Sequence, residues 1–556
     1  MWLLSSVLVF LLLYSTHAQY ISPSYANLTG PDGPVVDLGY IKLQGTRMIS
    51  ASFPVNAWLG VRYATSPTGQ LRFSPPQPIE ASGEANKIFD ASAFGPYCYQ
   101  GFPSVELADQ FPKFFNLGDR QPSEDCLLLD IYAPANPVSS RLPILLAIHG
   151  GGYDEGATTL TPPSGIMSAA PGEFIFVAMQ YRLAGFGFLG GAEVEESGTL
   201  NAGLLDQRLA MQWVQRHISA FGGDPSRVTI EGGSAGGGSV SYQLIWEGGE
   251  LNPPYRAAIA EYPWWQTYLN SSQLEIQYRE VLTAAKCDSI TCLRALSASD
   301  FNNAQQQILS LTEEYPFGMF YYGPTVDGRY IRNLPSQEIQ AQHFAKVALI
   351  TTRDGNEGYI FTPQNIKTEA DFQSRMRSLL NGGDNFFGRL TDYYPPTSTG
   401  PYAYNSTQQR AEYALGDWII QCPSYYLASF YADAFSRLGQ MAPPVYKFIY
   451  ALPTFRTAYH GGYSSLLYTL SPVAYDDCSH TAQMTRMIQN WFVSFVIDLN
   501  VNGGAGAFPK PEVKWPSYGP TSQILLINST KPTQIHDIDA AGRCDFYLAH
   551  PFNVQN

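Results

Sequence analysis

The chain has 556 residues, of which 45% are hydrophobic and only 14% are charged. This composition supports a large buried core and excludes an intrinsically disordered chain. The formal net charge of −14 argues against nucleic acid as a partner. We find no internal repeat, low-complexity tract or long linker, so one large domain over residues 19–556 is expected.

Residues 1–18 have the pattern of a cleaved secretory signal peptide. Leu3–Leu13 is apolar apart from two serines, and Thr16-His17-Ala18 resembles a small-residue cleavage site, although the usual basic start is missing. The apolar core is too short to span a bilayer comfortably, and no later stretch is apolar enough to do so. We therefore expect a secreted, extracellular protein without a stable membrane anchor.

Export makes two kinds of covalent modification possible. Glycosylation sequons begin at Asn27, Asn270, Asn405 and Asn528. Seven cysteines in an exported chain predict disulfides, and the odd number leaves at least one thiol unpaired unless two chains are joined through it. The residues alone leave the connectivity open.

Short runs rich in apolar or β-branched residues recur along the chain and predict buried strands. They are Ile144–Ile148, Phe174–Met179, Arg227–Ile230, Arg256–Ala260, Val347–Thr352 and Val445–Tyr450. Leu204–His217 lies between two of them and has helical apolar spacing. The alternation predicts an α/β fold with a mostly parallel, doubly wound sheet covered by helices on both faces. Catalytic groups in such folds follow the carboxyl ends of strands.

Residues 228–238 read as a strand, a tight glycine turn and the start of a helix, with Ser234 at the centre of a G-x-S-x-G pattern. In a nucleophile elbow such a turn exposes the serine hydroxyl. Glycines are needed beside the serine because side chains there would clash as strand and helix close up. The helix from Ala235 points backbone N–H groups at negative charge that forms beside Ser234.

A glycine-rich turn, His149-Gly150-Gly151-Gly152, follows the predicted strand that ends at Ile148. Such a turn points successive N–H groups into one concavity, which is what an oxyanion hole requires. We expect the N–H groups of Gly151, Gly152 and Ala235 to form it.

A serine hydroxyl becomes a good nucleophile only when a base takes its proton. His460 is the favoured base, because it lies in a glycine-containing loop after the strand that ends at Tyr450. The alternative, His480, opens an amphipathic helix behind the capping residue Ser479, which is an ordinary structural place.

The base in turn needs a carboxylate that orients it. Asp354 and Glu357 both follow the strand that ends at Thr352, and the residues alone do not choose between them. The chain order serine, acid, histidine is that of α/β-hydrolases.

Several further segments resemble the type-B carboxylesterase and lipase family, which includes cholinesterases and secreted fungal lipases. They are Glu124-Asp125-Cys126-Leu127, Tyr181-Arg182, Gly187–Gly190, Asn201–Arg208, Phe221–Pro225 and Trp515-Pro516-Ser517-Tyr518, and the resemblance extends over about residues 35–550. It implies the α/β-hydrolase fold, an acid followed by glycine, and a histidine in a loop after a strand. These features select Glu357 and His460.

The resemblance also implies a set of structural pairs. The disulfides are Cys98–Cys126, Cys287–Cys292 and Cys422–Cys544, which leaves Cys478 free, and the buried ion pairs are Arg72–Glu124 and Arg182–Asp206. One position departs from the family pattern. Gly233 stands immediately before the serine, where the family usually has glutamate. The loss of that charge puts the pH profile in doubt rather than the activity.

The sequence therefore predicts an enzyme that hydrolyses carboxylic esters through Ser234, His460 and Glu357, with no cofactor and no metal, since no histidine and carboxylate cluster has metal-ligand spacing. The alternative is a non-catalytic adhesion or binding module. The family contains such members, which lack a residue of the triad, whereas this chain has all three.

The partner we expect is a small-molecule or lipid ester that carries no charge. Trp264 and Trp265 follow a predicted strand, and with Tyr153 we assign them to the substrate pocket, while expecting one tryptophan to belong to the core. The loop between Cys98 and Cys126 holds four phenylalanines, as a flap over the site would. Residues 99–125 contain no tryptophan, which choline-ester relatives use to hold the quaternary ammonium group.

Overall fold

The computed structural model describes most of the chain: residues 32–49, 53–79, 86–101, 120–311, 320–398, 403–436, 442–451, 458–468, 478–503, 513–528 and 531–556. The predicted signal peptide and Asn27 lie outside these residues.

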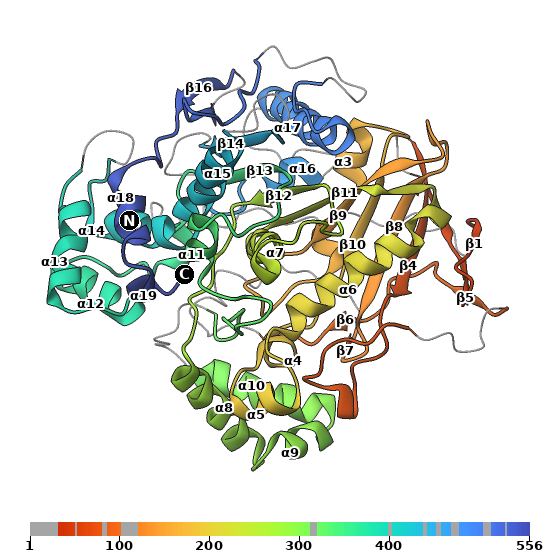
Figure 1. Ribbon diagram of the computed structural model, residues 1–556, viewed down its shortest axis with the longest axis horizontal. Helices are drawn as coiled ribbons and strands as arrows, with labels where there is room; N and C mark the ends of the chain where they lie inside the picture. Colours follow the sequence, from red (N-terminus) through yellow and green to blue (C-terminus); the bar gives the residue numbers. More distant parts are fainter. Residues whose placement is uncertain are drawn as a thin grey trace, which may run out of the picture.

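The described part of the chain is built around an 11-stranded sheet (Figure 1). In spatial order the strands are β16 (Thr533–His536), β15 (Gln523–Ile527), β14 (Val445–Tyr450), β13 (Ala348–Asp354), β12 (Ala257–Glu261), β11 (Gly223–Gly233), β9 (Leu142–Ile148), β10 (Ile175–Met179), β8 (Leu128–Pro134), β4 (Pro54–Arg62) and β3 (Thr46–Ile49). The seven strands from β15 to β10 are parallel. Antiparallel strands complete both edges.

The parallel strands β9, β10, β12, β13 and β14 are buried along their whole length, which is why their sequences are apolar runs rather than alternating patterns. β9, for example, reads LPILLAI and every residue of it is buried. The six predicted strands correspond to β9, β10, β11, β12, β13 and β14, and the seventh parallel strand, β15, was not predicted. The predicted fold class is therefore confirmed.

Helices cover both faces of the sheet (Figure 1). α6 (Ala202–His217) and α7 (Ala235–Leu244) lie on one face, and α3 (Ser164–Ala169) and α17 (Cys478–Asp498) lie on the other. α15 (Cys422–Phe435) packs on β13 and β14. The remaining helices are α4 (Ala184–Phe188), α5 (Ala192–Ser197), α8 (Ser271–Ala285), α9 (Ile290–Ala295), α10 (Ala298–Leu311), α11 (Pro335–Gln340), α12 (Glu369–Leu379), α13 (Asp384–Tyr393), α14 (Thr407–Gly416), α16 (Ser464–Tyr468), α18 (Gly542–Leu548) and α19 (Pro551–Val554). A smaller sheet combines β1 (Val35–Asp37), β2 (Lys42–Gln44) and β5 (Ile88–Asp90), and β6 (Tyr97–Cys98) pairs with β7 (Pro122–Ser123).

Covalent and ionic pairs cross-link separate segments of the chain. The disulfides of the described residues are the three expected ones, Cys98–Cys126, Cys287–Cys292 and Cys422–Cys544. Both expected ion pairs are also present and buried. The Arg72 guanidinium donates to Glu124 at 2.6 and 2.8 Å, and that of Arg182 donates to Asp206 at 2.7 and 2.8 Å. Two bonds per pair fix the relative geometry of the segments that carry them.

Candidate active site

Ser234 occupies a sharp turn between β11 and α7. Its backbone has φ 58° and ψ −125°, a conformation that non-glycine residues rarely adopt. Two glycines let strand and helix close around it. A Cβ at Gly232 would lie 2.6 Å from the carbonyl carbon of Gly236, and a Cβ at Gly236 would lie 2.1 Å from the carbonyl oxygen of Ile148. Larger residues therefore do not fit at these two positions, as the elbow pattern predicts.

The structure brings the side chains of Ser234, His460 and Glu357 into one hydrogen-bonded series. His460 Nε2 lies 2.8 Å from Ser234 Oγ, and His460 Nδ1 lies 2.6 Å from Glu357 Oε2. The three residues follow β11, β14 and β13, so the carboxyl ends of parallel strands collect them at one edge of the sheet. The other candidate base, His480, is in the first turn of α17, and its side chain lies outside the described residues.

Asp354 does not contact the imidazole in this series. It is the last residue of β13, and its backbone N–H donates to Glu357 Oε1 at 2.5 Å. Its own carboxylate accepts the N–H of Gly462 at 3.2 Å. Burial, followed by the charge of Glu357, raises the pKa of the Asp354 carboxyl well above its ordinary value. Asp354 thus supports the loop of Glu357, and Glu357 is the carboxylate that meets His460.

The glycine loop after β9 lies beside Ser234. Gly151 and Gly152 both have positive φ, 112° and 62°, which turns the loop over the serine. Among the described residues no protein acceptor is hydrogen-bonded to the N–H groups of Gly151 and Gly152. Ala235 begins α7, where its N–H is one of those that a helix leaves unpaired. The three predicted oxyanion donors are thus grouped around the serine.

His149, the first residue of the glycine loop, is a structural residue. Its ring is buried, stacks on Tyr181 at 4.5 Å, and its Nδ1 lies 2.9 Å from the carbonyl oxygen of Gly150. Burial lowers the pKa of His149 to about 4, so the ring is neutral at physiological pH. Its position behind the loop excludes it as a competing base for Ser234.

A cavity of about 160 Å³ opens at Ser234, and we call it the Ser234 cavity. Its wall is mainly apolar and aromatic, and none of the described residues that line it carries a carboxylate, ammonium or guanidinium group. The lining residues are Ile148, Gly150, Gly151, Gly152, Leu160, Thr161, Gly233, Ser234, Tyr262, Phe320, Ile360, Phe361, His460, Gly461, Ser464 and Tyr468.

The sequence reasoning missed most of this wall. Tyr262 and Phe361 both follow strands, so the rule that identified Ser234 would have found them. Nothing in the sequence around Phe320, Leu160 or Tyr468 indicates a pocket residue, because these side chains belong to segments that are distant from Ser234 in the chain.

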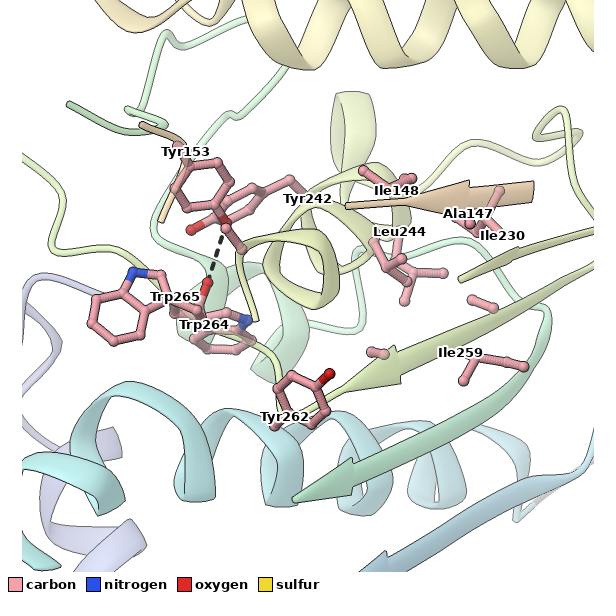
Figure 2. Packing of buried hydrophobic residues seen from close by; sticks show 14 of the residues in the cluster. Ala147, Ile148, Tyr153, Ile230, Tyr242, Leu244, Ile259, Tyr262, Trp264 and Trp265 are labelled. Carbon is pink, nitrogen blue, oxygen red and sulfur yellow. Dashed lines mark hydrogen bonds between the residues drawn. The ribbon is translucent and has the colours of Figure 1, made fainter. Parts of the chain in front are cut away.

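The three residues predicted to line the pocket lie behind its wall instead. Tyr153, Trp264 and Trp265 are all buried and none is part of the lining of the Ser234 cavity. Figure 2 shows the hydroxyl of Tyr153 donating to the backbone oxygen of Trp264, at 3.1 Å. The ring of Trp264 packs on Phe320 at 5.3 Å and on Phe361 at 4.7 Å, so it supports two wall residues. Trp265 is fully buried in the core, where its ring lies 6.1 Å from that of Tyr426.

Other predicted features fall partly outside the described residues. The flap proposed between Cys98 and Cys126 includes residues 102–119, and the side chain of Cys478 is likewise not described. Asn270, Asn405 and Asn528 are exposed. The described residues contain no cluster of three or more potential metal ligands. Within the same residues no helix has the length and apolarity needed to cross a membrane.

Comparisons with known proteins identify the family of the chain. The model of the carboxylesterase family matches residues 32–547. Carboxylesterase patB of Aspergillus clavatus is 30% identical over 524 residues, which cover 86% of this chain and 90% of that protein. Secreted triacylglycerol lipase LIP1 of Gibberella zeae is 28% identical over 89% of this chain and 87% of its own.

A solved structure supports the same assignment. The crystal structure of Aspergillus niger EstA superposes with a TM-score of 0.80 at 27% identity, over 94% of this chain and 99% of the other. The family model spans nearly the whole described chain, and the serine, histidine and glutamate meet at the edge of the sheet where α/β enzymes place their chemistry. The chain therefore belongs to the carboxylesterase family and is a carboxylic ester hydrolase.

Proposed function

We propose that this chain is a secreted serine hydrolase of uncharged carboxylic esters, and that Ser234, His460 and Glu357 form its catalytic triad. The observation that carries the proposal is the continuous series of hydrogen bonds from Ser234 Oγ through the imidazole to Glu357, 2.8 and 2.6 Å long. Nucleophile, base and orienting acid require that arrangement.

In the first half of the reaction Ser234 Oγ attacks the ester carbonyl while His460 Nε2 takes the hydroxyl proton. Glu357 keeps Nδ1 protonated, so Nε2 is the free acceptor, and it stabilises the imidazolium that forms. The imidazolium then donates its proton to the departing alcohol oxygen. The products of this half are a free alcohol and an acyl group on Ser234.

The negative oxygen of the tetrahedral intermediate is bound by the N–H groups of Gly151, Gly152 and Ala235. Donors held in place by the protein strengthen as charge develops, and removal of one typically costs about 3 kcal/mol of transition-state stabilisation. In the second half His460 takes a proton from water, the resulting hydroxyl attacks the acyl carbonyl, and Ser234 regains its proton as the carboxylic acid leaves.

The wall of the Ser234 cavity supports the choice of an uncharged substrate. Apolar and aromatic side chains bury hydrocarbon or flat acyl groups favourably. The described wall has no carboxylate that would compensate the desolvation of a choline cation. The relatives named a carboxylesterase and a triacylglycerol lipase are consistent with neutral esters.

Three observations support secretion. The predicted signal peptide precedes the domain, the described residues contain three disulfides, and the relative from Gibberella zeae is named as secreted. Mass spectrometry of the protein from culture medium tests this part, because a mature chain that begins near residue 19 is expected. Retention of residues 1–18 in the mature chain would contradict it.

The triad is tested with a fluorescent phosphonate that forms a covalent bond to an activated serine. The wild-type enzyme should be labelled and Ser234→Ala should not. Failure of the wild type to be labelled would favour the non-catalytic adhesion or binding module. Substrate class is tested by kcat/KM on butyrylcholine and on neutral butyrate and cinnamate-type esters. A higher value on butyrylcholine would overturn the assignment to uncharged esters.

A further inference from the structure

The side chain of Tyr262 occupies the space that a Cβ atom at position 233 would need. A Cβ atom at Gly233 would lie 2.2 Å from Tyr262 Oη and 2.5 Å from its Cζ, and the three nearest atoms all belong to Tyr262. Gly233 does not have a left-handed backbone, unlike Gly151. Its φ therefore does not require glycine, and the atoms that an added Cβ would meet first are those of Tyr262.

The same tyrosine ring meets the imidazole of His460. The two ring centroids are 5.0 Å apart with an interplanar angle of 79°. A second aromatic ring, Phe361, contacts the imidazole at 4.9 Å and 62°. Edge-to-face contacts of this kind favour one orientation of the rings over others. Side chains from two different strand-end loops thus restrict the imidazole that faces Ser234.

Tyr262 is itself held firmly. It follows β12 with φ 33°, an unusual value for a non-glycine residue, and its N–H donates to the backbone oxygen of Thr352 at 2.9 Å. The residue before it, Glu261, accepts the backbone N–H of Ser234 at 3.1 Å. Strained backbone that persists is held by its surroundings. The ring therefore has a defined position relative to the elbow.

We propose that Tyr262 is a positioning residue for His460, and that Gly233 is required because Tyr262 occupies the space in front of it. The inference rests on the proposed function, since it assigns Tyr262 a role in that reaction. Tyr262 exchanges no proton in it. The ring holds the imidazole in the orientation from which Nε2 reaches Ser234 Oγ.

The first test compares Tyr262→Ala with Tyr262→Phe on a neutral p-nitrophenyl ester. Loss of the ring should lower kcat by about 10- to 100-fold, the range expected when a catalytic group is displaced by about an ångström. KM should rise as well, because Tyr262 also lines the Ser234 cavity, so the positioning role is judged from kcat and from the rate of Ser234 labelling. Tyr262→Phe keeps the ring and should restore most of the lost kcat. Labelling of Ser234 by the phosphonate should slow in parallel with kcat.

The second test changes Gly233, the residue whose added Cβ would meet Tyr262. Gly233→Ala should lower kcat because its Cβ displaces the phenol, whereas the double variant Gly233→Ala/Tyr262→Ala should be no worse than Tyr262→Ala alone. Coupled residues show such non-additivity.

The matched control is Tyr446→Ala. Tyr446 has the same 6% exposure as Tyr262 and also contacts two aromatic rings, but it lies near the opposite end of the parallel strands. The Tyr446→Ala variant should have a lower free energy of unfolding than the wild type and an unchanged kcat.

The outcomes separate the inference from the proposed function. If the wild type hydrolyses the ester and is labelled at Ser234, but Tyr262→Ala keeps wild-type kcat, the inference is wrong and the triad stands. Wild-type kcat in Gly233→Ala, or effects that simply multiply in the double variant, would also overturn it. If Tyr262→Ala does not fold, Gly233→Ala and Tyr262→Phe still decide the matter. A wild type that is not labelled refutes both proposals.

Discussion

Replacement of Glu357 by glutamine tests the proposed triad at its least exposed member. Glu357 is fully buried and has two acceptors in use, Oε1 toward the N–H of Asp354 and Oε2 toward His460 Nδ1. Glutamine has the same shape but only one acceptor end. If its oxygen keeps the Asp354 N–H, its amide NH₂ faces Nδ1. The imidazole must then carry its proton on Nε2 and cannot accept one from Ser234.

The magnitude follows from the two orientations. Turning the amide around keeps the correct tautomer but leaves a buried N–H without an acceptor, which costs about 1–3 kcal/mol. The neutral amide also fails to stabilise the imidazolium, and loss of one partner of a buried charged pair costs about 3–5 kcal/mol. The sum of about 4–8 kcal/mol, at about 1.4 kcal/mol per factor of ten, predicts a loss of kcat of at least about 10³-fold. Neutralising a triad acid typically costs about 10⁴-fold.

The assay is kcat and KM on p-nitrophenyl butyrate for Glu357→Gln, together with its rate of phosphonate labelling. Asp354→Asn is the matched control, because Asp354 lies on the same loop but its raised pKa favours the neutral form that asparagine mimics. The control should keep kcat within about threefold, since no contact to His460 is lost. The reasoning is refuted if Glu357→Gln keeps more than about a tenth of the wild-type kcat. It is also refuted if the loss of kcat in Asp354→Asn is as large as the loss in Glu357→Gln.

Three further predictions concern the surroundings of the proposed triad. Trp265→Ala should lower the free energy of unfolding by about 3–5 kcal/mol without changing the preference for acyl groups. Trp264→Ala should lower the free energy of unfolding and also admit bulkier acyl groups, because the ring of Trp264 supports the cavity wall. Denaturant unfolding measures the stability of both variants, and a panel of esters measures their acyl preference. Gly152→Ala should lower kcat by about 10²–10³-fold, because its Cβ would lie 2.2 Å from a phenyl ring and displace an oxyanion donor. Burial, followed by a neighbouring carboxylate, raises the pKa of Glu261 well above 4.5, so its contribution to stability is present at acid pH and is lost as pH rises through the raised value. Glu261→Gln should therefore gain Tm relative to the wild type as pH rises, measured by thermal unfolding at several pH values.

Each of these predictions has an outcome that contradicts it. An unchanged substrate ranking in Trp264→Ala would mean that the wall does not depend on the tryptophan behind it. Wild-type kcat in Gly152→Ala would argue against its N–H as an oxyanion donor. A Tm difference for Glu261→Gln that does not vary with pH would show that this carboxyl does not titrate differently in the folded and unfolded states.

The sequence by itself determined the fold class and the candidate triad. Buried parallel strands read as continuous apolar runs, and all six predicted runs are strands of the parallel region. Strand-end positions then selected Ser234, His460 and a choice of two acids, because parallel strands bring their carboxyl ends to one edge. The glycines of the elbow were also readable, since only glycine fits where an added Cβ would lie less than 3 Å from another backbone atom.

Only the tertiary structure decided what surrounds the triad. Trp264 and Trp265 look like pocket residues in the sequence because large aromatic side chains follow a strand, yet one supports the wall and the other enters the core. Phe320 and Tyr468 form the wall although nothing near them in the chain indicates it. Local sequence specifies which loop a residue occupies. Which side of that loop meets the cavity depends on side chains packed from distant segments, as Tyr262 shows by filling the space in front of Gly233.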